Sequence, residues 1–147
     1  MPLSANEYFD LLKEQVALGK EVSMIITGNS MSPFLEHGKD TIYFKKPDRK
    51  LRRGDMVFFQ RENGKYVMHR LYKKKKNDCY FIGDNQTEIE GPLSEDHIFA
   101  VITKVKRKGR ILDQKSFWWF FFAHVWIHLI PLRPFIISCY QFIFRKK

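Results

Sequence analysis

Residues 22–33, VSMIITGNSMSP, join a strand pattern to a turn, and this stretch decides the fold that we predict. Apolar residues recur at every second position from Val22 to Ile26, which is typical of a half-buried β-strand. A Gly-Asn-Ser turn follows, because these residue types tolerate the backbone angles of a tight turn. Ser30 is therefore expected just beyond the end of a strand.

Upstream of this strand the sequence predicts one short amphipathic helix, at about residues 5–18. Ser4 followed by Glu7 matches a capping box, in which each side chain bonds a free backbone N–H of the first turn. Apolar residues recur at helical spacing until Gly19. The acidic N-terminal stretch has no apolar run, so it is neither a secretory signal nor a membrane span.

Downstream, short apolar segments separated by turn residues or charged runs predict a small, mainly β domain. These segments are residues 41–44, 56–60, 66–72, 80–82 and 98–106. Residues 61–65 contain Asn-Gly and predict a hairpin turn. The lysine run 73–76, with Asn77 and Asp78, predicts a second exposed turn.

The C-terminal part has a different composition, so we divide the chain into a folded domain, residues 1–116, and a hydrophobic aromatic tail, residues 117–147. The tail opens with an apolar run of 16 residues, 117–132, which is shorter than the roughly 20 residues that a membrane-spanning helix needs. Arg133 and Pro134 interrupt the run. It could form a helix in the membrane interface, a shallow hairpin or tilted span, or a core element of a soluble fold.

Membrane association is the alternative that we favour for this tail, which we expect to be helical. Its tryptophans and tyrosine, Trp118, Trp119, Trp126 and Tyr140, are the residue types enriched at membrane interfaces. A domain of 116 residues is also not expected to cover so many aromatic side chains.

The whole chain of 147 residues carries 26 Lys and Arg against 16 Asp and Glu, a formal charge of +10. Such a charge favours nucleic acid, anionic lipid or acidic peptide as partners. No groove-reading helix or aromatic platform accompanies the basic residues, so specific nucleic-acid binding is not expected. Cys79 and Cys139 lack the spacing of a zinc site, and we expect neither a metal nor a cofactor.

Four short motifs follow one another along the domain, and together they carry more information than any one alone. They are Gly28-Asn29-Ser30-Met31-Ser32-Pro33, Arg53-Gly54-Asp55-Met56-Val57, Tyr66-Val67-Met68-His69-Arg70 and Gly83-Asp84-Asn85. In this order and spacing, residues 20–107 resemble the superfamily of signal peptidases and LexA-type self-cleaving repressors, the S24/S26 serine peptidases. The resemblance implies a β-fold of that superfamily and peptide-bond hydrolysis.

This resemblance assigns the nucleophile to Ser30 and the general base to His69, where many relatives have Lys. A neutral imidazole, whose ordinary pKa is near 6.5, can accept the hydroxyl proton and return it to the leaving amine. Relatives with a His base place acids in and after Gly-Asp-Asn, which here correspond to Asp84 and Glu90. Either acid could orient His69, or Asp84 could instead brace the strands around the site.

The remaining site residues surround the nucleophile. The Ser30 N–H is expected to bind the developing oxyanion. Some relatives add a hydroxyl where Gly28 stands, so a main-chain contribution around Gly28 and Asn29 is expected as its substitute. Met31 and Pro33 are expected to shape the turn and the substrate groove. Asp55 and Arg70 are expected to be structural, and His37, His97, His124 and His128 to be incidental.

Only 29 residues precede Ser30, too few for a DNA-binding domain with a cleavage linker, so we expect cleavage of another chain, a leader or signal peptide or a membrane-associated precursor. Basic residues are more numerous on the domain side of the tail, at 104–115, than beyond it, at 145–147, which predicts a catalytic domain on the cytoplasmic face of a membrane. The alternative function is a catalytically inactive, basic, membrane-bound binding protein with the same fold.

Overall fold

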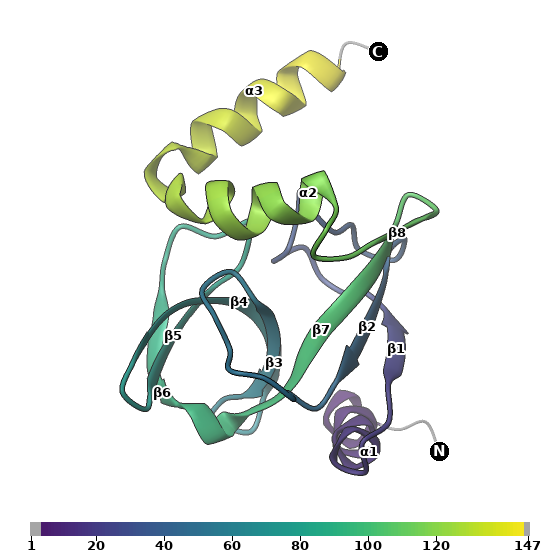
Figure 1. Ribbon diagram of the computed structural model, residues 1–147. Helices are drawn as coiled ribbons and strands as arrows, with labels where there is room; N and C mark the ends of the chain where they lie inside the picture. The colour runs from purple at the N-terminus through teal and green to yellow at the C-terminus, as the bar shows by residue number, and fades with distance from the viewer. Residues whose placement is uncertain (1–3, 146–147) are drawn as a thin grey trace.

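The predicted β domain is built on one antiparallel sheet in the computed structural model, which describes residues 4–145 (Figure 1). The strand order is β1-β2-β7-β3-β4-β5-β6, with β8 paired to β7. The strands are β1 (Val22–Ile25), β2 (Thr41–Lys45), β3 (Met56–Gln60), β4 (Tyr66–Lys75), β5 (Asp78–Ile82), β6 (Glu90–Ser94), β7 (Ile98–Arg107) and β8 (Arg110–Leu112), and a short 3₁₀ turn, η1 (Glu95–His97), precedes β7. The mainly β prediction is confirmed.

Helix α1 (Ala5–Ala17) confirms the predicted N-terminal helix. Its N-cap is Ser4, whose hydroxyl accepts a hydrogen bond from the Glu7 N–H, as the capping pattern predicts. Phe9 stacks on Tyr66 of β4 with ring centroids 5.4 Å apart. The Tyr66 hydroxyl also donates a hydrogen bond to the Asp10 carboxylate, so α1 is fixed against the β3–β4 hairpin.

The turn predictions have mixed outcomes. The hairpin at 61–65 is confirmed, since the Arg61 N–H donates to the Lys65 carbonyl and Gly64 adopts a positive φ of 90°. The lysine run was predicted wrongly, because residues 73–75 continue β4 through pairing with β5 and the turn begins at Lys76. Strands β6 and β8 were not predicted, since neither has a run of alternating apolar residues.

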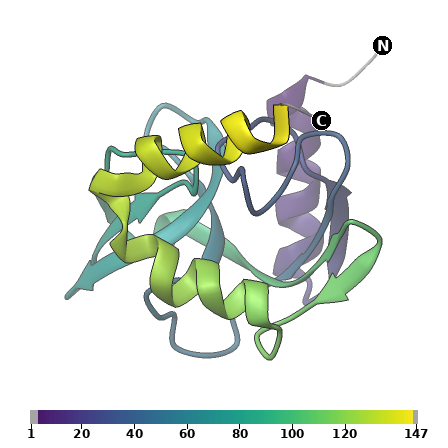
Figure 2. The same cartoon turned by 90° about the horizontal axis from the view of Figure 1, so that it is seen from above.

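After β8 the chain forms helical turns at the end of the sheet opposite to α1 (Figures 1 and 2). Together they form two helical arms bent by 92°, Phe117–His128 and Ile130–Ile143. Their elements are α2 (Phe117–Phe120), η2 (Phe121–Val125), η3 (Trp126–His128), η4 (Ile130–Leu132) and α3 (Arg133–Arg145). Within residues 4–145 no single helix has both the length and the apolarity to cross a membrane, whereas these two arms meet the length and composition requirement only when taken together.

The first arm belongs to the apolar core of the domain. Trp119, Phe122 and Trp126 are at most 6% exposed and lie in one cluster with Met31 and Phe34 of the Ser30 loop. The expectation that the domain would leave the aromatic residues of the tail uncovered is therefore wrong for these three side chains, whereas Phe117 and Phe120 of the same arm are exposed. The first arm covers the Ser30 loop, because the rings of Trp119 and Phe122 contact the ring of Phe34.

The second arm differs, because α3 presents most of its apolar side chains outward. Phe135 is 71% exposed and Ile143 is 59% exposed, whereas Ile136 and Ile137 contact the core. Trp118, which precedes them in α2, is also 46% exposed. The hydrophobic tail therefore contains a buried part and an exposed part.

Candidate active site

Ser30 and His69 line the same pocket. Ser30 lies in the loop between β1 and β2, and His69 lies on β4. The pocket has a volume of about 310 Å³ and is also lined by Phe9, Met24, Ile26, Thr27, Phe58, Arg61, Tyr66, Val67, Met68 and Gln86. The structure thus brings together the two residues that sequence analysis assigned to nucleophile and base, although no hydrogen bond joins them within residues 4–145.

The register of β4 and β5 explains this proximity. Arg70 pairs with Ile82, so His69 is opposite Gly83, the first residue after β5. A Cβ atom on Gly83 would lie 2.6 Å from the Ser30 carbonyl oxygen and 3.1 Å from Cδ2 of His69. Only a residue without a side chain fits between the serine loop and the imidazole.

His69 is an uncharged base at neutral pH in this environment. The ring is 2% exposed, and its burial lowers the pKa of His69 to about 4. The Glu90 carboxylate opposes this pKa shift, and the Arg61 guanidinium adds to it. Nδ1 of His69 is buried and has no hydrogen-bond partner within the described part of the chain.

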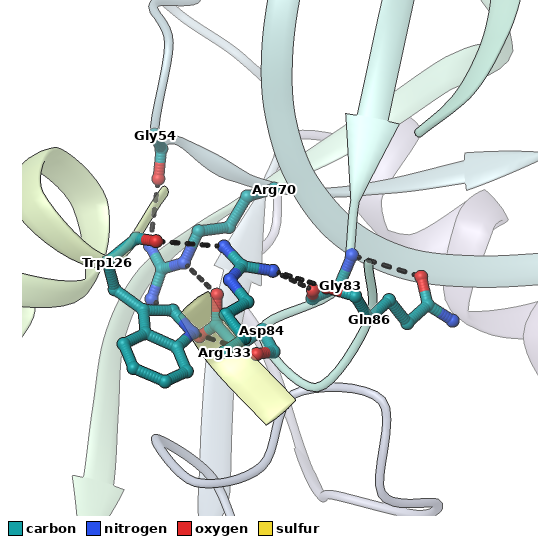
Figure 3. Close-up of polar contacts among 7 residues, drawn as sticks. All are labelled: Gly54, Arg70, Gly83, Asp84, Gln86, Trp126 and Arg133. Atoms are coloured by element: carbon teal, nitrogen blue, oxygen red, sulfur yellow. Dashed lines mark hydrogen bonds and ion pairs between the residues drawn. The ribbon is translucent and has the colours of Figure 1, made fainter. Parts of the chain in front are cut away.

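Asp84 does not orient His69 in this structure. Both of its carboxylate oxygens accept hydrogen bonds from Arg70, at 2.7 and 3.2 Å, and the two side chains are fully buried (Figure 3). Successive residues of a strand point to opposite faces, so Arg70 and its partner Asp84 lie on the face away from His69. Arg70 also donates to the Gly54 carbonyl, so the Arg70–Asp84 pair braces the strands. This is the second of the two roles that the sequence suggested for Asp84.

Glu90 lies on the same face of the sheet as His69. It pairs with Phe81, which in turn pairs with Leu71, two residues after His69 on β4. Its carboxylate is held by Arg61 through two hydrogen bonds of 2.7 Å. Glu90 therefore acts on the imidazole through its charge, without a direct hydrogen bond in the residues that the structure describes.

The main-chain donors around the nucleophile are divided between two roles. The Gly28 N–H donates to Nδ1 of His37 at 2.7 Å, so this donor is engaged and the expected contribution of Gly28 to the oxyanion site is not available in this structure. We find no acceptor for the Ser30 N–H within residues 4–145. Ser30 thus retains the main-chain donor that an oxyanion site requires.

The other predicted residues shape the loop from inside. The Asn29 carbonyl accepts a hydrogen bond from the Ser32 N–H at 3.1 Å, which closes the turn. Met31 is 2% exposed and packs in the core, so it anchors the loop and does not line the pocket. Pro33 is half-buried and also lies outside the pocket lining.

Sequence analysis missed several residues that hold this site. Gly83 was quoted in a motif, but its role as a spacer depends on strand register. His37 was treated as incidental, yet it binds the nucleophile loop. Trp126 and Arg133 of the tail contact the loop at 83–86, and no local pattern connects segments so far apart in sequence.

Comparison with known families gives one result for the domain. A family model described as Peptidase S24-like matches residues 3–106, which include both residues of the proposed dyad and Asp84 and Glu90. The comparison with curated proteins gives no match.

Proposed function

Because this chain belongs to the Peptidase S24-like family, whose model matches most of its length, we propose that it is a serine endopeptidase with Ser30 as nucleophile and His69 as general base. The observation that carries the proposal is the shared pocket, in which the serine loop and the imidazole are separated only by the space that Gly83 leaves. A serine loop beside a buried neutral imidazole is the arrangement that acyl transfer requires.

The reaction proceeds by acyl transfer. His69 takes the proton from Ser30 Oγ while this oxygen attacks the carbonyl carbon of the scissile bond. The Ser30 N–H donates to the oxyanion, and the negative charge of Glu90 stabilises the imidazolium. His69 then returns the proton to the leaving amine, and water hydrolyses the acyl-serine by the same steps.

The substrate that we propose is another polypeptide, a leader or signal peptide or a membrane-associated precursor. The pocket supports this, because no segment of residues 4–145 occupies it. An extended peptide could reach it beside β1, which has an unpaired edge in the described sheet.

Comparison of newly formed peptide N-termini, by mass spectrometry of membranes from cells that express the wild type or Ser30→Ala, tests this function. We expect a set of termini that appears only with the wild type, since loss of the nucleophile lowers the rate by about 10³-fold or more. Ser32→Ala is the matched control, because it changes a serine of the same loop that does not line the pocket. It should produce the same termini as the wild type.

If Ser30→Ala is folded and present, and the termini do not differ, the proposal is wrong. The alternative, an inactive membrane-bound binding protein of the same fold, would then take its place.

We propose further that the exposed apolar side chains of the tail bind a membrane surface. Exposed apolar side chains gather on α2 and α3, among them Phe117, Trp118, Phe135 and Ile143. Basic residues precede the tail at 104–115 and favour anionic lipid. This arrangement supports a catalytic domain held against the cytoplasmic face, and protease protection in membrane fractions tests that orientation. A domain protected from protease added at the cytoplasmic side would contradict it.

A further inference from the structure

The first arm of the tail and the start of α3 reach back to the loop that follows β5. The indole N–H of Trp126 donates to the Asp84 carbonyl at 2.8 Å. Nη1 of Arg133 donates to the carbonyls of Gly83 and Gln86, at 2.9 and 2.7 Å. Nη2 of Arg133 donates to the main-chain carbonyl of Trp126 at 3.1 Å, which links the two residues into one clamp (Figure 3).

The clamped loop, residues 83–86, contacts the backbone of Ser30, which lies in the separate loop between β1 and β2. The Asn85 N–H donates to the Ser30 carbonyl at 2.9 Å, and Gly83 lies against that carbonyl. The Gln86 side chain accepts a hydrogen bond from the Gly83 N–H and lines the pocket. A shift of residues 83–86 would therefore move the Ser30 backbone directly.

Within the described residues, Arg133 forms no hydrogen bond with a carboxylate. Asp84 directs both oxygens to Arg70, so two guanidinium groups and one carboxylate are buried together. Arg133 is 1% exposed and uses main-chain carbonyls as its described partners. Burying a cation is unfavourable unless its donors are paired, and Nε of Arg133 has no hydrogen-bond partner within the described residues, so the cation depends on its bonds to main-chain carbonyls.

We infer that Trp126 and Arg133 are positioning residues, which hold the loop at 83–86 against Ser30 so that docking of the C-terminal segment sets the geometry of the nucleophile. This inference rests on the proposed function, because it takes Ser30 as the nucleophile. It adds that the tail takes part in building the active site, independently of any contact with lipid.

Amide hydrogen exchange of the full chain, followed by mass spectrometry, tests the clamp without a substrate. Arg133→Met removes its hydrogen bonds and should accelerate exchange at the Asn85 amide by about tenfold or more, as expected for a local opening. Trp126→Phe keeps an aromatic side chain but loses the indole N–H donor, and should give a smaller increase. Arg133→Lys keeps the charge and one donor group, and should restore part of the protection.

Ile127→Ala is the matched control, because Ile127 is a fully buried side chain of the same arm. It loses apolar packing but leaves the clamp in place. Exchange at Asn85 should follow only its global loss of stability, measured by denaturant unfolding. The inference would be overturned if exchange at the Asn85 amide were accelerated equally in Ile127→Ala and Arg133→Met once their global stabilities are matched. It would also be overturned if this amide were as protected in Arg133→Met as in the wild type.

A kinetic measurement on a peptide found in the N-terminus comparison separates positioning from substrate binding. Arg133→Met should lower kcat by about tenfold or more with KM changed less than about threefold, since the clamp supports the nucleophile and not the peptide. A change in KM alone would contradict the positioning role. If Ser30→Ala shows no loss of cleavage, the proposed function fails while the exchange result still decides whether the clamp exists.

Discussion

His69 is buried, and the role of general base that we propose for it requires an uncharged imidazole. Its folded-state pKa of about 4 lies below the ordinary value of 6.5. The neutral form therefore persists well below pH 6. We expect the acid limb of the pH profile of kcat/KM to have its midpoint near pH 4, because activity is lost as His69 is protonated. A midpoint near 6.5 would contradict this prediction.

The same pKa predicts how stability depends on pH. As the pH falls below about 6.5 the unfolded chain binds a proton at this histidine before the folded chain does. Stability from this group is thus full above about pH 6.5 and is lost as the pH falls towards 4, by on the order of 3 kcal/mol. Denaturant unfolding between these pH values measures the loss, and His69→Gln should flatten the dependence.

Gly83 matters because of space, since it does not adopt one of the positive φ values that other glycines show. Gly83→Ala places a methyl group 2.6 Å from the Ser30 carbonyl oxygen, so the serine loop must move. We expect activity to fall by about 10²-fold, with a loss of about 1–3 kcal/mol in the free energy of unfolding. Peptide cleavage and denaturant unfolding check the two effects.

Gly109→Ala is the control for this change. Gly109 has a φ of 82° in the β7–β8 turn and open space around its Cα, so alanine there strains the backbone far from the pocket. It should lower stability without lowering activity. Equal activity losses in the two variants would show that Gly83 has no special role as a spacer.

At the scale of elements, the two faces of β4 separate His69, the proposed base, from the buried ion pair of Arg70 and Asp84. Asp84→Asn leaves the buried Arg70 guanidinium without its carboxylate, and we expect it to lower the free energy of unfolding by about 3–5 kcal/mol. It should leave the titration of His69 nearly unchanged, because Asp84 lies on the opposite face. Chemical denaturation and NMR titration of the imidazole measure the two effects.

Glu90→Gln is the contrasting variant on the face of His69. It removes a negative charge that raises the pKa of His69, so this pKa should fall further. A larger change of the His69 pKa in Asp84→Asn than in Glu90→Gln would reverse our assignment of the two acids.

At the scale of the whole molecule, one part of the tail is buried in the core and another part is exposed at the surface. A chain that ends at residue 116 would uncover the core contacts of Trp119, Phe122 and Trp126. Each such side chain contributes about 1.5–3 kcal/mol through burial, so we expect this form to be unfolded or aggregated. A chain that ends at residue 133 retains the first arm and should remain folded. Circular dichroism and size-exclusion chromatography of both forms check this, and a stable fold at 116 would contradict it.

Vesicle flotation measures the contribution of the second arm to lipid binding. Phe135→Ser combined with Ile143→Ser removes two exposed apolar side chains and should weaken binding to phosphatidylglycerol-containing vesicles by about tenfold or more. Leu18→Ser, at the end of the molecule occupied by α1, removes an equally exposed apolar side chain and should leave binding unchanged. Equal binding by both variants and the wild type would contradict membrane contact through α3.

Local pattern sufficed for much of the domain. The cap at Ser4, the alternation after Val22 and the Asn-Gly hairpin each depend on neighbours within a few residues, and the structure confirms all of them. The resemblance placed Ser30 and His69 in one site, and the shared pocket agrees with it. Strands β6 and β8 escaped prediction, because pairing with a neighbouring strand and not their own composition makes them strands.

Tertiary structure alone decided which acid faces the base and what covers the aromatic tail. Asp84 and Glu90 are equivalent as sequence, but strand register puts them on opposite faces, and a face is defined only once distant strands pair. The tail is apolar from 117 to 132 except for His124 and His128, so its composition cannot show which side chains the core will bury. Trp119, Phe122 and Trp126 are buried because they pack against Met31 and Phe34 of the Ser30 loop, and apolar surface is buried where shape and space allow close packing.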